Sequence, residues 1–262
     1  MTELFATDLY IPPYRHAEHG DWKLSSIPMG TGLGYWSSER GYIYQNAAIL
    51  TNTGASGRTW MSMTPLEIES SEAGVRAAKG HSVIMGFGMG WTAAAMAMRP
   101  EVETVTVVEI DPDIPALFDL AVPAEARPAE WEKVEVVIAD ARTWRPAGGV
   151  DFLFADIWPR MGLAENLADV REMQSNIWAE ELYYWGQELD LSNLAVELGW
   201  RPDPPPEEAR DPNGAGEPLS EELAEAAWDA LGLPVVMAEP AAERIEGAWR
   251  EWRRRMVPTG GA

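Results

Sequence analysis

The chain has 262 residues, a formal net charge of −22, no cysteine and three histidines. The lack of cysteine excludes disulfides, thiolate metal sites and a cysteine nucleophile, and so few histidines leave no basis for expecting a metal. Such a negative charge argues against DNA or RNA as a partner, because Lys and Arg supply most of the affinity for phosphates, and it fits a cationic or neutral substrate.

The first 63 residues are aromatic, glycine-rich and turn-rich, and predict a small β-rich unit. Strand-like segments occur at 35–36, 42–44 and 48–50. Thr64 and Glu67 then show the spacing of a capping box, with Pro65 at the first helical position. A helix is therefore expected up to about Lys79, before Gly80.

An apolar strand, residues 81–86, passes into a helix at Thr92 through three alternating glycines, Gly86, Gly88 and Gly90. Glycine permits positive φ angles and lets the backbone approach a ligand closely. The N-terminus of the following helix adds a partial positive charge. The segment is therefore typical of a ligand-binding turn, although the glycine pattern alone would be weak evidence.

Each later strand of the predicted domain leads to an acidic residue. Apolar strands are expected at 105–110, 134–138 and 150–154. Glu109 ends the first of them, close to the spacing from Gly86 at which an acid accepts ribose hydroxyls in dinucleotide folds, and Asp140 and Asp156 follow the other two. Strands that alternate with helices predict an α/β protein with a Rossmann-like, doubly wound parallel sheet. Ligands bind such sheets at the carboxyl ends of the strands, where these residues fall.

The remainder of the chain reads as helical. Apolar residues from 163 to 189 keep helical spacing and predict one long amphipathic helix, and no further strand is recognisable. Its aromatic residues could line a pocket, although core packing is their more frequent use; they are Trp178, Tyr183, Tyr184 and Trp185. The expected organisation is a β-rich unit at 1–63, a Rossmann-like domain at 64–200, a Pro- and Gly-rich linker at 201–219 and a helical extension at 220–262.

With these motifs in place, residues from about 64 to 160 resemble class I S-adenosylmethionine-dependent methyltransferases, specifically the spermidine synthase-like branch. The glycine motif of that branch, its Glu-Ile-Asp, its Asp-Ala and its fourth-strand Asp match residues 86–90, 109–111, 140–141 and 156. The resemblance implies that the glycines approach the amino acid part of S-adenosylmethionine, that Glu109 binds the ribose and that Asp140 contacts the adenine amine. The expected cofactor-binding residues are Gly86, Phe87, Gly88, Gly90, Glu109, Ile110, Asp140, Ala141, Asp156 and Trp158.

The chemistry of the strand ends agrees with this cofactor. S-adenosylmethionine has no pyrophosphate, so its site needs acids rather than a cationic cradle, and no Lys or Arg lies between Gly86 and Met98. This favours an adenosyl sulfonium over NAD. Asp156 is the candidate general base, with the alternative that it only orders the cofactor loop. Trp158 and Trp91 are candidate pocket walls, since aromatic faces also attract cations.

Two departures from aminopropyltransferases favour methyl transfer. Trp158 stands where that family has a second acid, and residues 59–63, Thr-Trp-Met-Ser-Met, stand where it has Tyr-(His/Gln)-Glu. We therefore expect a methyltransferase acting on a small molecule or peptide, cationic or neutral. Two alternatives remain: an aminopropyltransferase that uses decarboxylated S-adenosylmethionine, and a nonenzymatic partner or scaffold protein. The sequence leaves the oligomeric state open, and a homodimer is one of the options.

The sequence also predicts where the protein acts. No run of about 18 apolar residues is present, and the N-terminus has neither the basic start nor the apolar core of a signal peptide. The expected location is the cytoplasm, without a membrane partner.

Overall fold

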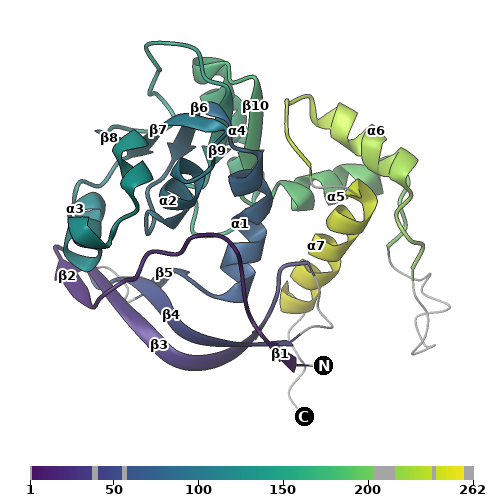
Figure 1. Cartoon of the computed structure of the whole chain (residues 1–262). Helices are drawn as coiled ribbons and strands as arrows, with labels where there is room; N and C mark the ends of the chain where they lie inside the picture. The colour runs from purple at the N-terminus through teal and green to yellow at the C-terminus, as the bar shows by residue number, and fades with distance from the viewer. Residues whose placement is uncertain (1, 37–40, 55–57, 203–215, 238–239, 257–262) are drawn as a thin grey trace.

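The computed structural model describes residues 2–36, 41–54, 58–202, 216–237 and 240–256, with 251–256 in backbone only. This part of the chain forms two β-sheets and seven α-helices (Figure 1). Most of the predicted linker, residues 203–215, and the end of the predicted extension, residues 257–262, lie outside the described residues.

The N-terminal sheet is built around a long antiparallel hairpin. Its strands are β1 (Thr2–Leu4), β2 (Ala17–His19), β3 (Trp22–Leu33), β4 (Gly41–Asn52) and β5 (Arg58–Ser62). β3 pairs with β4 and β2, while β1 and β5 both pair with β4. The expected strand segments 42–44 and 48–50 lie in β4, whereas residues 35–36 lie outside any strand, contrary to the prediction.

The second sheet has five parallel strands in the order β10-β9-β6-β7-β8. They are β6 (Gly80–Met85), β7 (Val102–Glu109), β8 (Val134–Ile138), β9 (Phe152–Ala155) and β10 (Glu181–Tyr184). The chain moves outward from β6 to β8 and then crosses back to β9, so the strand order reverses between β6 and β9. The predicted Rossmann-like, doubly wound parallel sheet is confirmed, and this reversal is the place where such sheets bind ligands.

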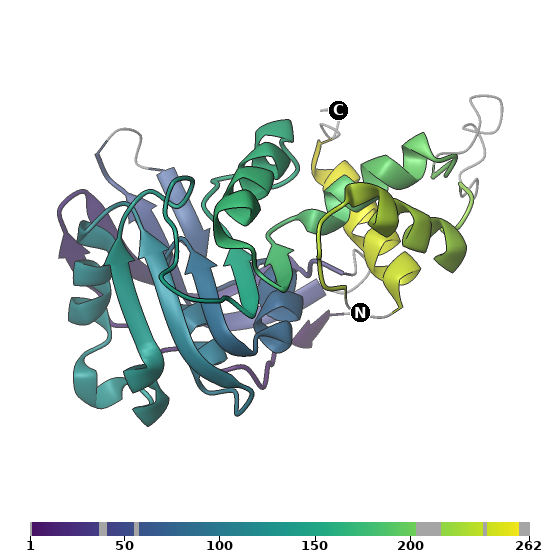
Figure 2. The same cartoon turned by 90° about the horizontal axis from the view of Figure 1, so that it is seen from above.

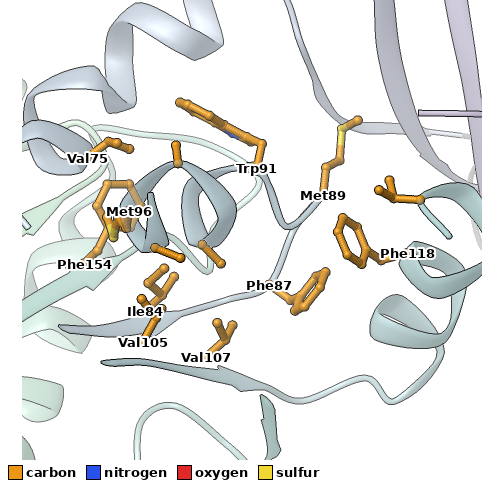
Figure 3. Packing of buried hydrophobic residues seen from close by; sticks show 14 of the residues in the cluster. Val75, Ile84, Phe87, Met89, Trp91, Met96, Val105, Val107, Phe118 and Phe154 are labelled. Atoms are coloured by element: carbon orange, nitrogen blue, oxygen red, sulfur yellow. The ribbon is translucent and has the colours of Figure 1, made fainter. Parts of the chain in front are cut away.

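Helices cover both faces of the parallel sheet. They are α1 (Pro65–Ala77), α2 (Trp91–Ala97), α3 (Asp113–Ala121), α4 (Ala164–Ile177), α5 (Gln187–Glu197), α6 (Glu221–Leu231) and α7 (Ala241–Met256), with two short 3₁₀ turns, Ala124–Ala126 and Ala129–Lys133, before β8. Successive strand side chains point to opposite faces. Ile84 and Phe154 therefore pack with α1, α2 and α3, as Figure 3 shows for α2, while Val83 and Leu153 pack with α4, α5 and α6.

The single long helix expected from 163 to 189 is wrong. α4 ends at Ile177. Its C-cap residue, Trp178, has a φ of 56° in the left-handed region, and the chain then enters β10 before α5 begins. β10 is the further strand that the sequence did not reveal. Residues 182–184 are buried, because β10 pairs with β9 and is covered on both faces, so its continuous apolar run imitates a helical pattern.

The capping box expected at the start of α1 does not form. The side chain of Thr64 caps no helical N–H and lies 3.1 Å from the hydroxyl of Ser62, hydroxyl to hydroxyl. Glu67 is consequently not engaged in a cap.

The C-terminal helices α5, α6 and α7 pack together beyond β10 (Figure 2). Ser220 caps α6 by accepting the N–H of Leu223 at 3.3 Å, as expected for a helix that begins there. The rings of Trp200 and Trp249 meet edge to face at 5.4 Å between centroids, which ties α7 to the end of α5. None of the described helices is long and apolar enough to cross a bilayer.

Candidate active site

The carboxyl ends of the parallel strands meet at one edge of the sheet. Backbone hydrogen bonds continue past the strands at 2.9 Å, from Gly86 to Val108, from Asp156 to Met85 and from Ala139 to Glu109. These bonds hold the segments that follow β6, β9 and β8 side by side. A cavity of about 240 Å³ opens at this edge.

Most of the expected cofactor-binding residues line this cavity: Gly86, Gly88, Glu109, Ile110, Asp140, Ala141, Asp156 and Trp158. Phe87 and Gly90 are not among its lining residues. The Phe87 ring is buried against Phe118, at 5.3 Å between centroids, and Gly90 begins α2 beside the same rings (Figure 3). Trp91, an expected pocket wall, is also buried in this core.

Two of the glycines are required by close approaches. Gly86 has a φ of 94°, and a Cβ there would lie 2.2 Å from the carbonyl oxygen of Asp156. Gly88 has a φ of 53°, and a Cβ there would lie 2.7 Å from the sulfur of Met61. A larger residue at either position would be strained by the positive φ. At Gly86 it would also push apart the ends of β6 and β9, whereas at Gly88 only the flexible side chain of Met61 would have to move.

Glu109 binds the glycine turn with one carboxylate oxygen and the segment after β7 with the other. Its Oε2 accepts the N–H of Phe87 at 2.8 Å, and its Oε1 accepts the N–H of Asp111 at 2.8 Å. Each carboxylate oxygen has a second lone pair, so these bonds leave acceptor capacity on the cavity side. Glu109 is therefore fixed in place for further hydrogen bonds from a ligand.

The segments that follow β7 and β8 bring an apolar side chain, Ile110, and a polar one, Asp140, to the cavity. Asp140 accepts the N–H of Arg142 at 3.0 Å, which forms a tight turn after β8. Ile110 lies on the cavity with 66% of its surface exposed, an unusual exposure for a large aliphatic residue. A flat ring with an exocyclic amine would cover Ile110 and reach Asp140.

The N-terminal sheet forms the opposite side of the cavity. Trp22 of β3 and Trp60 and Met61 of β5 line it. The indole N–H of Trp22 donates to Asp111 Oδ2 at 2.8 Å, and its ring meets that of Trp60 edge to face at 5.6 Å. The cavity is therefore shared between the two sheets, and Asp111 serves as their link.

Two carboxyl groups of the cavity lining are close enough to repel each other, that of Glu67 in α1 and that of Asp156 after β9. Within the described ranges neither side-chain carboxyl group accepts a hydrogen bond, while the backbone carbonyl of Glu67 accepts one from Ser70. Burial raises the pKa of Asp156 to about 7. Burial, with added repulsion from Asp156, raises the pKa of Glu67 to about 8. Near neutral pH this pair therefore holds at least part of a proton, and it would gain from a cationic partner.

The sequence did not assign Glu67 or Arg142 to the site, and it offered Trp185 only as one of four aromatic residues that could line a pocket. Glu67 was interpreted as a helix cap, and its true position depends on how α1 meets β9. Trp185 lines the cavity directly after β10, whereas Trp178 from the same predicted helix is 81% exposed. Since β10 was not predicted, no sequence signal distinguished these two tryptophans.

The charge of the cavity selects among ligands. Within the described chain, its lining has five carboxyl groups, of Glu67, Glu109, Asp111, Asp140 and Asp156, and one cationic side chain, of Arg142. The positive charge of Arg142 is already paired with Asp169, to which its guanidinium donates two hydrogen bonds. A ligand with a pyrophosphate would meet repulsion here, whereas a sulfonium or ammonium would be attracted.

The fold and the cavity together define a Rossmann-like α/β protein with an acidic site at the strand reversal. No family model and no curated protein matches the chain. Part of it is similar to the N-methyltransferase NodS from Bradyrhizobium japonicum, with 12% identity over 41% of this chain and 58% of that one and a TM-score of 0.31. A second similar structure is a SAM-dependent methyltransferase from Geobacter sulfurreducens in complex with S-adenosyl-L-homocysteine. It has 15% identity over 44% of this chain and 44% of that one, with a TM-score of 0.33. A third is the glycopeptide N-methyltransferase MtfA with the same ligand, with 18% identity over 42% of this chain and 41% of that one and a TM-score of 0.32.

The matched part spans less than two thirds of each of these structures. At these identities and TM-scores, the likenesses carry no conclusion about the activity of this chain.

Proposed function

We propose that the protein is a methyltransferase that uses S-adenosylmethionine and acts on a small molecule or peptide, within the spermidine synthase-like branch. The observation that carries this proposal is the convergence of the glycine turn, Glu109 and Asp140 on one acidic cavity at the strand reversal. The surplus of carboxylates suits a ligand with a sulfonium and an ammonium and no phosphate.

The residues present fit this cofactor. Glu109 would accept the ribose hydroxyls, because its carboxylate is fixed by two backbone N–H groups and retains free lone pairs. Asp140 and the exposed Ile110 would receive the adenine, and the turn at Gly86 and Gly88 would lie against the amino acid part. When bound, S-adenosylmethionine supplies a methyl group on a sulfonium, which is already a strong electrophile.

The chain then has to position the acceptor, exclude water and remove a proton. Trp158, Trp185 and Trp60 provide aromatic walls that exclude water and attract cations. Asp156 accepts the proton of the acceptor's nucleophilic atom, and a pKa of about 7 suits a base that works near neutral pH. Glu67 faces it and favours an acceptor that carries a positive charge.

A second candidate is aminopropyl transfer from decarboxylated S-adenosylmethionine. The observation in its favour is Glu67, which adds a second carboxyl group beside Asp156 to the cavity lining, whereas the sequence had Trp158 where aminopropyltransferases have a second acid. Two unpaired carboxyl groups are the partners that a diamine needs, since a buried unpaired ammonium is costly.

Side-by-side incubation with both donors separates the candidates. The purified protein is mixed with putrescine and, separately, with a fractionated cell extract, and products are examined by mass spectrometry. We expect the mass gain of one methyl group on an extract component with the intact donor. A gain of an aminopropyl group on putrescine with the decarboxylated donor would instead establish the second candidate.

The role of Asp156 is tested in the same assay. Asp156→Asn keeps the size of the side chain and removes the base, so the rate should fall by roughly 10²–10⁴-fold. Asp229→Asn, on the exposed side of α6, is the matched control and should leave the rate unchanged. A loss within about threefold for Asp156→Asn would mean that this carboxyl only orders the site.

A further inference from the structure

Asp169 of α4 lies behind the cavity and binds two of the residues that line it. Arg142 donates from Nε to Oδ1 at 2.9 Å and from Nη2 to Oδ2 at 2.7 Å. The indole N–H of Trp158 donates to the same Oδ2 at 2.8 Å. Asp169 is not itself a lining residue, and its side chain is 17% exposed. One carboxylate thus collects three charge-assisted hydrogen bonds from the cavity wall.

The protonation of Asp169 suits this role. Burial alone would raise its pKa, but the hydrogen bonds from Arg142 and Trp158 outweigh burial and hold the pKa below its usual range. The group is consequently ionised at any pH near neutrality. Hydrogen bonds to an ionised acceptor are shorter and about twice as strong as those between neutral groups.

The two residues that Asp169 holds belong to different segments of the rim. Arg142 is part of the turn after β8, and its backbone N–H binds Asp140 at 3.0 Å. A second bond, from the side-chain amide of Asn176 on α4 to the carbonyl oxygen of Arg142 at 2.8 Å, holds the same turn. Trp158 belongs to the segment after β9, two residues beyond Asp156. α4 therefore fixes both segments relative to each other.

We propose that Asp169 is a positioning residue, which sets the turn of Asp140 and the ring of Trp158 in the arrangement that binds the donor. The inference rests on the proposed function, because it assigns Asp140 and Trp158 to the donor site. Asp169 acts through Arg142 and Trp158 and does not touch the ligand. Without Asp169, the indole of Trp158 loses its only hydrogen bond among the described residues. The turn after β8 loses the pair of hydrogen bonds that the guanidinium of Arg142 donates to the carboxylate.

The test measures the binding of S-adenosylhomocysteine by calorimetry. Asp169→Asn keeps the shape and removes the charge, and it should weaken binding about tenfold, because charge-assisted bonds that preorganise the site are lost. Glu165→Gln, an exposed position in the first turn of α4, is the matched control and should stay within about twofold of the wild type.

A double-mutant cycle shows whether the effect passes through Trp158. Trp158→Phe removes the indole N–H, so the additional loss from Asp169→Asn should be clearly smaller in that background than alone. The indole N–H resonance that disappears in Trp158→Phe identifies Trp158 by NMR. In Asp169→Asn this resonance should move upfield, because its hydrogen bond to a carboxylate is lost; a purely structural role elsewhere would leave it in place.

The outcomes separate the inference from the function on which it rests. A wild-type protein that does not bind S-adenosylhomocysteine overturns both. Wild-type binding with an unchanged affinity in Asp169→Asn overturns the positioning role alone. If Asp169→Asn does not fold, Arg142→Lys is measured instead, because it keeps the positive charge but cannot donate the two parallel hydrogen bonds of the guanidinium. An unchanged affinity in that variant would equally contradict the inference.

Discussion

Glu109 combines a structural and a binding task in one side chain. Its two oxygens accept the backbone N–H of Phe87 in the glycine turn and that of Asp111 after β7, and the same residue lines the cavity. The structural bonds remove the freedom of the side chain before any ligand arrives. A ligand hydroxyl therefore meets an acceptor that is already oriented.

Removing this carboxylate should weaken the binding of S-adenosylhomocysteine. We expect Glu109→Ala to lower the affinity by one to two orders of magnitude, because charge-assisted hydrogen bonds are worth about 1.5–3 kcal/mol. Calorimetry measures the change. Glu103→Ala, an exposed position on the same strand, is the control and should bind as the wild type does. Equal affinities for both variants would show that Glu109 is only a strand-end acid.

The paired carboxyl groups make a prediction about stability and pH. The pKa of Glu67 is raised to about 8 and that of Asp156 to about 7, so the folded protein holds more protons than the unfolded chain between about pH 4 and pH 8. The free energy of unfolding should therefore fall as the pH rises through this window. One proton of difference corresponds to about 1.4 kcal/mol per pH unit.

Urea denaturation at several pH values measures this slope. Glu67→Gln removes the group with the higher pKa and should make the decline shallower. Glu72→Gln, on the same helix but paired with Arg76, is the matched control and should keep the decline of the wild type. The same slope for Glu67→Gln and the wild type would contradict the paired arrangement.

At the scale of elements, the order of strands and glycine turns could be predicted and the region after β9 could not. β6, β7 and β8 are apolar runs that lead into the glycine turn or an acidic residue, so their presence and order are visible in the sequence, although β7 begins at Val102 rather than at the expected residue 105. β10 is four residues long, is buried on both faces and lies between two helices whose apolar spacing continues across it. α4 and β10 are separated by the left-handed conformation of Trp178. Glycine or asparagine at this position would have indicated such a turn, but tryptophan does not.

Trp178 therefore offers a test of the break between α4 and β10. A left-handed conformation costs a non-glycine residue roughly 1–2 kcal/mol. The greater freedom of glycine in the unfolded chain offsets roughly 0.5–1 kcal/mol of this. Trp178→Gly should therefore have a free energy of unfolding about 0.5–1 kcal/mol above that of Trp178→Ala, which retains the penalty and equally removes the exposed ring. Denaturant unfolding compares the two. If Trp178→Gly were the less stable variant, the chain would not turn at this residue.

The whole molecule places a cavity between two sheets that successive parts of the chain form, residues 2–62 and 80–184. Residues of the N-terminal sheet, Trp22, Trp60 and Met61, complete a site whose polar groups come mainly from the ends of the parallel strands. The strand-end acids were predictable because parallel strands bring their carboxyl ends to one edge. Glu67 and Arg142 were not, because their places depend on how α1 and the turn after β8 pack, which no local pattern encodes.

The central claim is that this acidic cavity binds an adenosyl sulfonium donor. Calorimetry of the wild-type protein with S-adenosylmethionine, S-adenosylhomocysteine and NAD tests it most directly. We expect a dissociation constant in the micromolar range for the first two, about −8 kcal/mol, and no detectable heat with NAD. Tight binding of NAD without binding of either adenosyl ligand would contradict the account.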